Sequence, residues 1–176
     1  MEVGEMRRAL MDSTIHVVAQ GDFDKATTRA ISSGAGLNDA YIYRLFDSKR
    51  GLFKATFSHL DKRLCSMLLR YMPIIEVSSM DMQKRCWMYF SHVWEKVLSD
   101  YEKCFYFMRY YHSAYFSDCS SEERKKDYKL VIERLTPVFK PNVDVWFELN
   151  VIFDIAFATA LKVVRGYIPH DNAHVR

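Results

Sequence analysis

Side chains that can form hydrogen bonds with DNA lie close together in the segment ATTRAISSGAGLNDAYIYRLFDSKRGL, residues 26–52. The hydroxyl of Tyr43 and the ammonium group of Lys49 can bind phosphate oxygens, which fixes a protein on a duplex. Arg44 and the residues that follow Asn38 can meet the edges of bases, if a helix carries them into the major groove. This chemistry needs no cofactor and no metal ion.

The same segment predicts two short helices joined by a tight turn. The first helix is expected from about Thr27 to Ser33, with Gly34 and Gly36 supplying the backbone freedom of the turn. Asn38 is expected to cap the second helix, from Asp39 to Phe46, because its side chain can accept hydrogen bonds from free amide groups. This arrangement is typical of a helix-turn-helix.

The second helix of the pair has one apolar face and one polar face. Ile42 and Phe46 are four residues apart, so both lie on the face that we expect to be buried. The residues predicted to face outward, toward DNA, are Asp39, Ala40, Tyr41 and Arg44.

Over roughly residues 10–57 the chain resembles the N-terminal domain of the TetR family of bacterial transcriptional repressors. The matching positions are Gly21, Phe23, Thr27, Thr28, Ile31, Ala35-Gly36-Leu37, Ile42-Tyr43, Phe46, Ser48-Lys49 and Leu52. The resemblance implies that Tyr43 and Lys49 contact phosphates, that residues after Asn38 contact bases, and that Thr28 attaches the preceding helix to the DNA backbone. The predicted DNA-binding residues are therefore Thr28, Asn38, Asp39, Ala40, Tyr41, Tyr43, Arg44 and Lys49.

Residues 38, 39 and 41 depart from the family pattern, which usually has Ser at the cap, a basic or small residue at position 39 and Thr at position 41, whereas Ala40 fits the usual Gly or Ala. Asp39 is unfavourable near phosphates unless it accepts a hydrogen bond from a cytosine amino group, and Tyr41 is large for close contact with bases. The operator sequence therefore cannot be taken from relatives.

The composition predicts an ordinary globular, all-α protein. The chain has 176 residues, 49% of them hydrophobic, and a formal net charge of +3 that alone would not indicate nucleic acid. Only one glycine, Gly166, follows Gly51, and the rest is long periodic sequence typical of helices. We expect about 8-9 helices in two domains: a three-helix DNA-binding domain, 1–50, and a C-terminal bundle for regulation, ligand binding and dimerisation, 51–176.

Apolar periodicity, caps and prolines set the expected helix boundaries. Ser78 and Asp81 resemble a capping box, Ser120 and Glu123 another, and Asn142 is expected to cap the last helix. Residues 73–79 are the expected linker. The longer helices are expected at about 5–20, 48–71, from the Ser78 cap to 99, 101–116, 120–136 and 143–165.

The last helix predicts a homodimer. Its apolar side chains, between Val145 and Val164, cover a sector too wide to be buried on one side only. The second face would meet a second copy around a two-fold axis. The resemblance implies the same, since TetR-family proteins dimerise through their last two long helices, here residues 122–136 and 143–165. Two helix-turn-helix motifs would then require a near-palindromic operator in double-stranded DNA.

Residues 87–116 hold twelve aromatic side chains in thirty positions. They can be ordinary core, because large aromatic residues dominate helical cores, or they can line a pocket for a flat or amphipathic small molecule. The resemblance implies that an effector binds among these helices. The predicted ligand-binding residues are Met67, Trp94, Tyr111, Tyr115 and Phe157, and the sign of the ligand's charge stays open.

Catalysis, cofactors and metal ions are not expected. The six histidines are scattered and no catalytic or phosphate-binding motif is present. His170 and His174 are four residues apart, but Pro169 and Asn172 argue against a helix there that could chelate a metal ion. The four cysteines form no CxxC pair, so we expect reduced thiols. No signal peptide or membrane span is expected, and the expected compartment is the cytoplasm.

Two functions follow from these observations. The first is a DNA-binding repressor that a small molecule releases from its operator, with repression implied by the resemblance alone. The alternative is a helical dimer whose helix-turn-helix no longer binds DNA and which acts as a protein-binding adaptor, as Asp39 and Tyr41 would allow. Tyr43→Phe and Lys49→Ala distinguish them, because only a DNA-binding protein should lose affinity and salt dependence.

Overall fold

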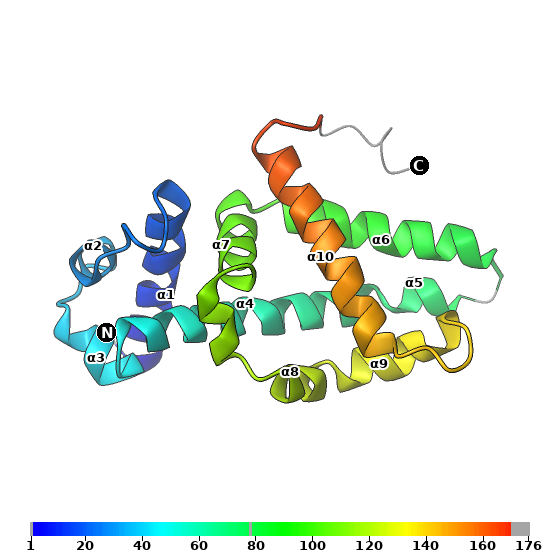
Figure 1. Ribbon diagram of the computed structural model, residues 1–176, viewed down its shortest axis with the longest axis horizontal. Helices are drawn as coiled ribbons and strands as arrows, with labels where there is room; N and C mark the ends of the chain where they lie inside the picture. Colours follow the sequence, from blue (N-terminus) through cyan, green and yellow to red (C-terminus); the bar gives the residue numbers. More distant parts are fainter. Residues whose placement is uncertain (1, 78, 170–176) are drawn as a thin grey trace. The chain divides into compact units, whose positions relative to one another are not determined.

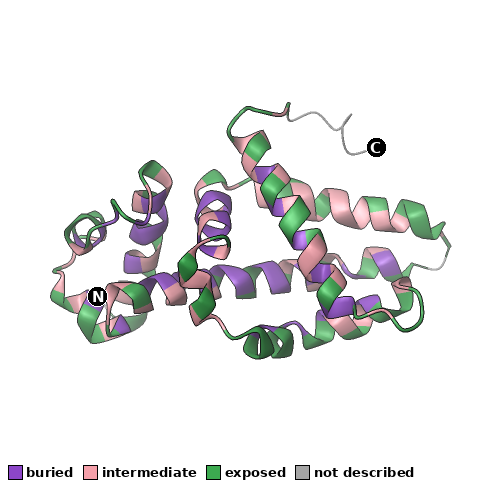
Figure 2. Ribbon diagram, viewed as in Figure 1, coloured by how far each residue is buried: buried purple, intermediate pink, exposed green. Residues whose placement is uncertain are grey.

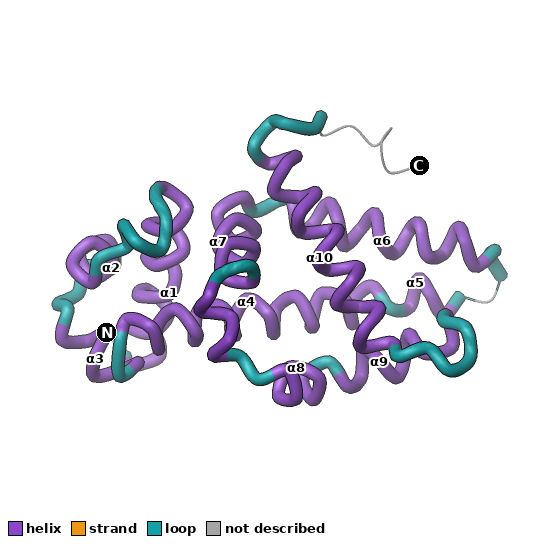
Figure 3. Tube along the Cα trace, viewed as in Figure 1, coloured by secondary structure: helices purple, strands orange, loops and turns teal. Residues whose placement is uncertain are grey.

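The computed structural model describes residues 2–77 and 79–169, and all regular structure in these ranges is helical (Figures 1 and 3). The all-α prediction is therefore confirmed. The chain forms two compact units: unit 1 comprises residues 1–61 and 105–119, and unit 2 comprises residues 62–104 and 120–176. No helix among the described residues is long and apolar enough to cross a membrane.

Unit 1 contains the three helices of the predicted helix-turn-helix region: α1 (Val3–Gln20), α2 (Thr28–Gly34) and α3 (Ala40–Phe46). They are followed by the first part of α4 (Lys49–Tyr71). The Thr27 side chain caps α2 by accepting a hydrogen bond from the Ala30 amide. The residues at the centre of this unit have no exposed surface: Leu10, Val18, Ile31, Ile42, Leu52 and Phe53.

Unit 1 also contains most of α7 (Tyr101–Tyr111) and the 3₁₀ helix η1 (Ala114–Asp118). Figure 2 shows α7 as largely buried. Its Tyr106 hydroxyl donates to the Phe53 carbonyl oxygen at 2.9 Å, and the rings of Phe23 and Phe53 pack against Tyr115 of η1. Arg50 also forms a bidentate ion pair with Asp118, at 2.5 and 2.6 Å.

Unit 2 is built on the second part of α4. The other helices of this unit are α5 (Pro73–Glu76), α6 (Met82–Leu98), α8 (Ser121–Asp127), α9 (Lys129–Leu135), the 3₁₀ helix η2 (Thr136–Val138) and α10 (Val145–Val164). Its core contains Met72, Tyr128, Val131 and Ala160, all with no exposed surface. These compact units differ from the expected functional domains, 1–50 and 51–176, and that functional division stays a prediction.

Several boundaries differ from the sequence-based expectation. The helix expected at 120–136 is two helices, because Tyr128 leaves helical geometry between α8 and α9. The helix expected to reach Phe116 ends at Tyr111, and Ser113 caps η1 by accepting from the Tyr115 amide. Pro73 begins a helical turn, α5, within the expected linker.

Two of the expected caps are also different. The cap of α10 is Asp144, whose carboxylate accepts from the amides of Trp146 and Phe147, whereas Asn142 has a φ of 68° and precedes the helix. Asp81 itself caps α6 by accepting from the Lys84 amide. Ser78, the other half of that expected box, lies outside the described residues, as do His170 and His174.

Candidate nucleic-acid interface and apolar cavity

Helix α3 presents one face to solvent. Ile42 and Phe46 are buried on the opposite face, at 0% and 5% exposure. Ala40 and Arg44 are exposed, Tyr43 keeps 54% of its surface exposed, and Tyr41 is half-buried. The face predicted to meet DNA is therefore free within the described chain, with Tyr41 at its edge.

The turn before α3 has the expected chemistry. Gly36 has a φ of 66°, in the left-handed region that favours glycine. The Asn38 side chain is exposed and its Oδ1 accepts a hydrogen bond from the Ala40 amide at 2.9 Å. Asn38 thus satisfies one of the free amides at the start of α3.

Asp39, the residue that was unfavourable near phosphates, faces α2. Its Oδ1 accepts a hydrogen bond from the hydroxyl of Ser32, which is only 2% exposed. Its Oδ2 accepts from the Thr28 hydroxyl at 3.4 Å. The carboxylate is therefore occupied inside the protein and joins the two helices of the motif. Ser32 was not among the predicted site residues, because no local pattern pairs a serine with an aspartate seven residues later.

Arg7 holds the other end of α3. Its Nη1 donates to the Leu45 carbonyl oxygen, one of the carbonyl groups that a helix end leaves without a partner inside the helix. Its guanidinium carbon lies 4.3 Å from the centre of the Phe46 ring. A positive charge at a helix C-terminus is also favourable for the helix dipole. Arg7 therefore binds the C-terminal end of α3.

Two glycines permit close packing around the motif. A Cβ atom at Gly51, in the first turn of α4, would overlap with the carbonyl oxygen of Phe46. A Cβ atom at Gly34 would overlap with the Ser13 hydroxyl, which donates to the Ile31 carbonyl oxygen at 2.7 Å. Gly34 is the last residue of α2, so close contact with α1 explains it better than freedom in the turn.

The predicted phosphate contacts lie on both sides of α3. Lys49 begins α4 and is half-buried, and its Nζ lies 5.4 Å from the centre of the Phe53 ring. The Ser48 hydroxyl accepts from the Gly51 amide at 2.9 Å, which caps this first turn. Thr28 is half-buried, with its hydroxyl directed to Asp39. Only Tyr43 of the three is strongly exposed.

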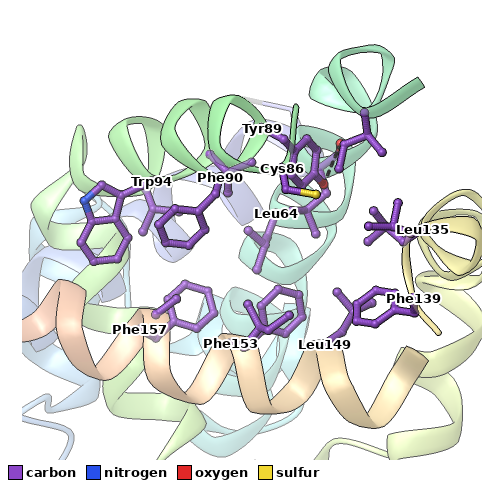
Figure 4. A pocket seen from close by; sticks show the side chains of 17 residues that line it. Leu64, Cys86, Tyr89, Phe90, Trp94, Leu135, Phe139, Leu149, Phe153 and Phe157 are labelled. Carbon is purple, nitrogen blue, oxygen red and sulfur yellow. Dashed lines mark hydrogen bonds between the residues drawn. The ribbon is translucent and has the colours of Figure 1, made fainter. Parts of the chain in front are cut away.

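Unit 2 contains an apolar cavity of about 230 Å³. Figure 4 shows α6 side chains on one side of it and α10 side chains on the other. The lining residues are Leu64, Leu68, Ile75, Cys86, Tyr89, Phe90, Val93, Trp94, Val97, Leu135, Val138, Phe139, Leu149, Ile152, Phe153, Ala156 and Phe157. Tyr89 brings a hydroxyl, but it donates to the Leu68 carbonyl oxygen at 3.2 Å. No lining residue carries a formal charge at neutral pH.

Two of the five predicted ligand-binding residues, Trp94 and Phe157, line this cavity. Met67 is half-buried on α4 and is not among the lining residues. Tyr111 and Tyr115 belong to unit 1, where the Tyr111 ring packs on Phe116. The α6 stripe of residues 86, 89, 90, 93, 94 and 97 follows helical spacing and could have been found from the sequence.

Residues 10–56 match the model of the family described as "Bacterial regulatory proteins, tetR family". The chain has the helix-turn-helix segment and the fold of the TetR family. No curated protein is similar enough to match the chain.

Solved structures of TetR regulators are similar over nearly the whole chain. A TetR-family transcription regulator from Marinobacter aquaeolei VT8 has a TM-score of 0.75 and 17% identity, covering 98% of this chain and 90% of that chain. A putative TetR-family regulator from Shewanella sp. PV-4 has a TM-score of 0.77 and 14% identity, covering 97% and 91%. The transcriptional regulator FadR from Bacillus subtilis, solved in complex with stearoyl-CoA, has a TM-score of 0.68 and 17% identity, covering 93% and 90%. At such identities the likeness shows the TetR-family fold.

Proposed function

We propose that this chain is a sequence-specific, DNA-binding transcription regulator. The observation that supports this most directly is the exposed face of α3, held at both ends inside a segment that matches the TetR family. A helix that is fixed in this way can enter a major groove without losing its orientation. The protein acts without catalysis and in the cytoplasm.

The side chains of the helix-turn-helix have three roles: contact with bases, contact with phosphates and support of the two helices. Ala40, Tyr41 and Arg44 contact bases, with Arg44 suited to bidentate hydrogen bonding with guanine. Tyr43 and Lys49 contact phosphates on either side. Asp39 and Thr28 act by keeping α2 and α3 together, and the exposed Asn38 starts the helix beside them.

We propose that the active form is a homodimer joined through α8, α9 and α10. Exposed apolar side chains support this proposal: Phe147 is 63% exposed and Ile155 is 64% exposed, and both lie on one face of α10 because they are eight residues apart. Leu130 of α9 is 50% exposed. A two-fold dimer binds a near-palindromic operator.

Regulation comes from a small molecule in the cavity of unit 2. Stearoyl-CoA in the FadR complex supports an apolar, acyl-type ligand, as does the uncharged lining of this cavity. The ligand favours a conformation that shifts α4, which is continuous from Lys49 to the cavity residues Leu64 and Leu68. Occupied protein then leaves its operator and repression ends. A tenfold loss of DNA affinity requires a preference of only about 1.4 kcal/mol for the released conformation.

The adaptor alternative depended on Asp39 and Tyr41. The hydrogen bonds of Asp39 with Ser32 and Thr28 explain that aspartate without any loss of DNA binding. We therefore prefer the DNA-binding function.

The experiment is an electrophoretic shift with purified protein on the DNA that flanks its own gene, at two salt concentrations. The wild type should shift this DNA, and Lys49→Ala should weaken the shift and reduce its salt dependence. Lys96→Ala is the control, because Lys96 is an exposed lysine of α6 in unit 2 and lies outside the proposed dimer interface. A shift that depends on neither Tyr43, tested as Tyr43→Phe, nor Lys49 would support the adaptor. Equal loss in both lysine variants would mean that the binding depends on overall charge and not on the motif.

A further inference from the structure

One buried donor in unit 2 has no hydrogen-bond partner. This donor is the Nε of Arg85. Within residues 2–77 and 79–169 it is the only buried side-chain nitrogen or oxygen without a hydrogen-bond partner. A buried donor without a partner is costly, and most such groups in proteins are satisfied. The position of Arg85 indicates what could satisfy it.

Arg85 lies beside one end of the apolar cavity, although it is not itself one of the lining residues. It stands on α6 immediately before Cys86 and one turn before Tyr89, and both of these residues line the cavity. Its Nη1 donates to the carbonyl oxygen of Ile75, another lining residue, at 2.6 Å. The guanidinium is therefore fixed beside the Ile75 end of the cavity, with Nε still able to donate.

Two charged side chains near this end of the cavity are paired with each other. Glu76, next to Ile75, is neutralised by a bidentate ion pair with Arg134, in which both distances are 2.7 Å. The hydrogen bond from Arg134 lowers the pKa of Glu76, so the pair stays ionised at neutral pH. Burial raises the pKa of Tyr89, which keeps this hydroxyl uncharged. Arg85 is then the uncompensated charge among these four side chains.

The rest of the cavity is suited to hydrocarbon. Phe90 and Trp94 of α6 lie across from Phe153 and Phe157 of α10 in Figure 4. Aromatic rings can also bind a cation, but this cavity has no carboxylate in its lining, and the Arg85 guanidinium is bonded to the backbone of the lining residue Ile75. A cation would be repelled there, and a neutral ligand would leave Nε unsatisfied.

We propose that the cavity binds an anionic amphiphile, with its apolar body between α6 and α10 and its carboxylate or phosphate head accepting from Arg85. This assigns a ligand class to the cavity, and its regulatory consequence rests on the proposed function. An anionic acceptor suits a guanidinium because charge-assisted hydrogen bonds are the stronger ones.

The test compares ligands of one chain length by isothermal titration calorimetry on the full chain. The probes are dodecanoate, dodecyl phosphate, dodecanol and dodecyltrimethylammonium, all below their critical micelle concentrations. At least one of the two anions should bind about 10-fold or more tightly than the alcohol, and the cation should be weakest. Which anion binds better tells carboxylate from phosphate.

Arg85→Gln should remove most of the preference for the anion, by about 10- to 100-fold, and leave dodecanol binding nearly unchanged. Lys84→Gln is the matched control, because Lys84 is the exposed neighbouring cation and should have no effect. Glutamine can still donate to the Ile75 carbonyl, and a thermal melt checks that the variant is folded. If it is not, the wild-type comparison of the four probes decides.

Binding of the alcohol or the cation as tightly as both anions would overturn the proposal, as would anion binding that does not depend on Arg85. Binding of none of the probes would overturn it as well. None of these results would change the conclusion about DNA binding, because the electrophoretic shift is measured without ligand.

Discussion

The hydroxyl of Ser32 donates to the carboxylate of Asp39, so that the residue just before α3 is held by α2. The Thr28 hydroxyl reaches the second oxygen of the same carboxylate at 3.4 Å. An acidic residue that looks unfavourable for DNA binding is thus a structural part of the helix-turn-helix.

Asp39→Ala should lower DNA affinity without changing which bases are preferred. The change removes the hydrogen bonds that join α2 and α3 and should cost about 1 kcal/mol in the free energy of unfolding, because the buried Ser32 hydroxyl can still donate to the Arg29 carbonyl oxygen at 3.2 Å. Chemical denaturation measures this cost, and fluorescence anisotropy on a bound duplex measures affinity. Ser32→Ala should act in the same direction, and Asp39→Ala in the Ser32→Ala background should add little. A changed base preference at one operator position would instead mean that Asp39 contacts a base.

Gly51→Ala should disturb α3, because the new Cβ atom would overlap with the Phe46 carbonyl oxygen. We expect a loss of about 1–3 kcal/mol in the free energy of unfolding, as for other overpacked sites, and a loss of DNA affinity. Gly4→Ala is the control, since no atom lies within 4 Å of its added Cβ. That control should be neutral or slightly stabilising. Similar melting curves for the two variants would show that the contact between α3 and α4 is loose.

Local patterns were sufficient to predict the helix-turn-helix. Gly36 has the left-handed φ expected of the turn, and Ile42 and Phe46 are buried as their spacing indicates. Contacts between distant residues were not predictable in this way. Arg7 binds the Leu45 carbonyl 38 residues away, and no local periodicity contains that information.

The local sequence also did not determine where the individual aromatic side chains of residues 87–116 lie. Its composition predicted rings that are either core or pocket, and both outcomes occur: Trp94 lines the cavity of unit 2, whereas Tyr106 and Tyr110 are buried in unit 1. Whether an aromatic residue lines the cavity of unit 2 or lies in the core of unit 1 depends on the end of α7 at Tyr111 and on the packing of α7. An amphipathic pattern specifies neither. The opposite wall of the cavity, from α10, was predicted only at Phe157.

The ion pair of Arg50 with Asp118 predicts a pH dependence within unit 1. The hydrogen bond from Arg50 lowers the pKa of Asp118 from its usual value of 3.8. Because the pKa of Asp118 is lower in the folded than in the unfolded protein, its carboxylate stabilises the folded state at pH values above the unfolded pKa. This contribution is lost as the pH falls through the pKa of the folded state. The wild type should therefore have a higher melting temperature than Asp118→Asn at pH 6. The difference should be small, because the ion pair is partly exposed, and it should shrink below about pH 4. A difference that is constant from pH 7 to pH 3 would contradict the pairing.

Phe147→Glu together with Ile155→Glu should convert the proposed dimer to a monomer of 20.8 kDa. Both side chains are exposed in the single chain, so the changes should leave the fold intact while placing charges inside the interface. Size-exclusion chromatography with light scattering measures the mass. Val3→Glu, at a 55% exposed apolar residue of α1, should keep the dimer. An unchanged mass for the double variant would place the interface elsewhere.

Ala156→Leu should fill part of the cavity in unit 2, because Ala156 lies in its lining. Extra apolar contacts should stabilise the unliganded protein by about 0.5–2 kcal/mol and weaken the binding of any ligand that needs the space. Thermal unfolding with and without dodecanoate measures both effects. A destabilised protein that binds dodecanoate as before would show that the cavity is not its site.

The exposed face of α3 is proposed to contact DNA bases, and in vitro selection from a pool of randomised duplexes tests this contact. Wild type should enrich a near-palindromic sequence, and Arg44→Ala should relax the preference at one symmetric position in each half-site, at a cost of about 1–3 kcal/mol per contact. Lys49→Ala should weaken binding without changing the selected sequence. If the wild type enriches no sequence, or if Arg44→Ala enriches the same sequence with the same affinity, α3 does not contact the bases as proposed.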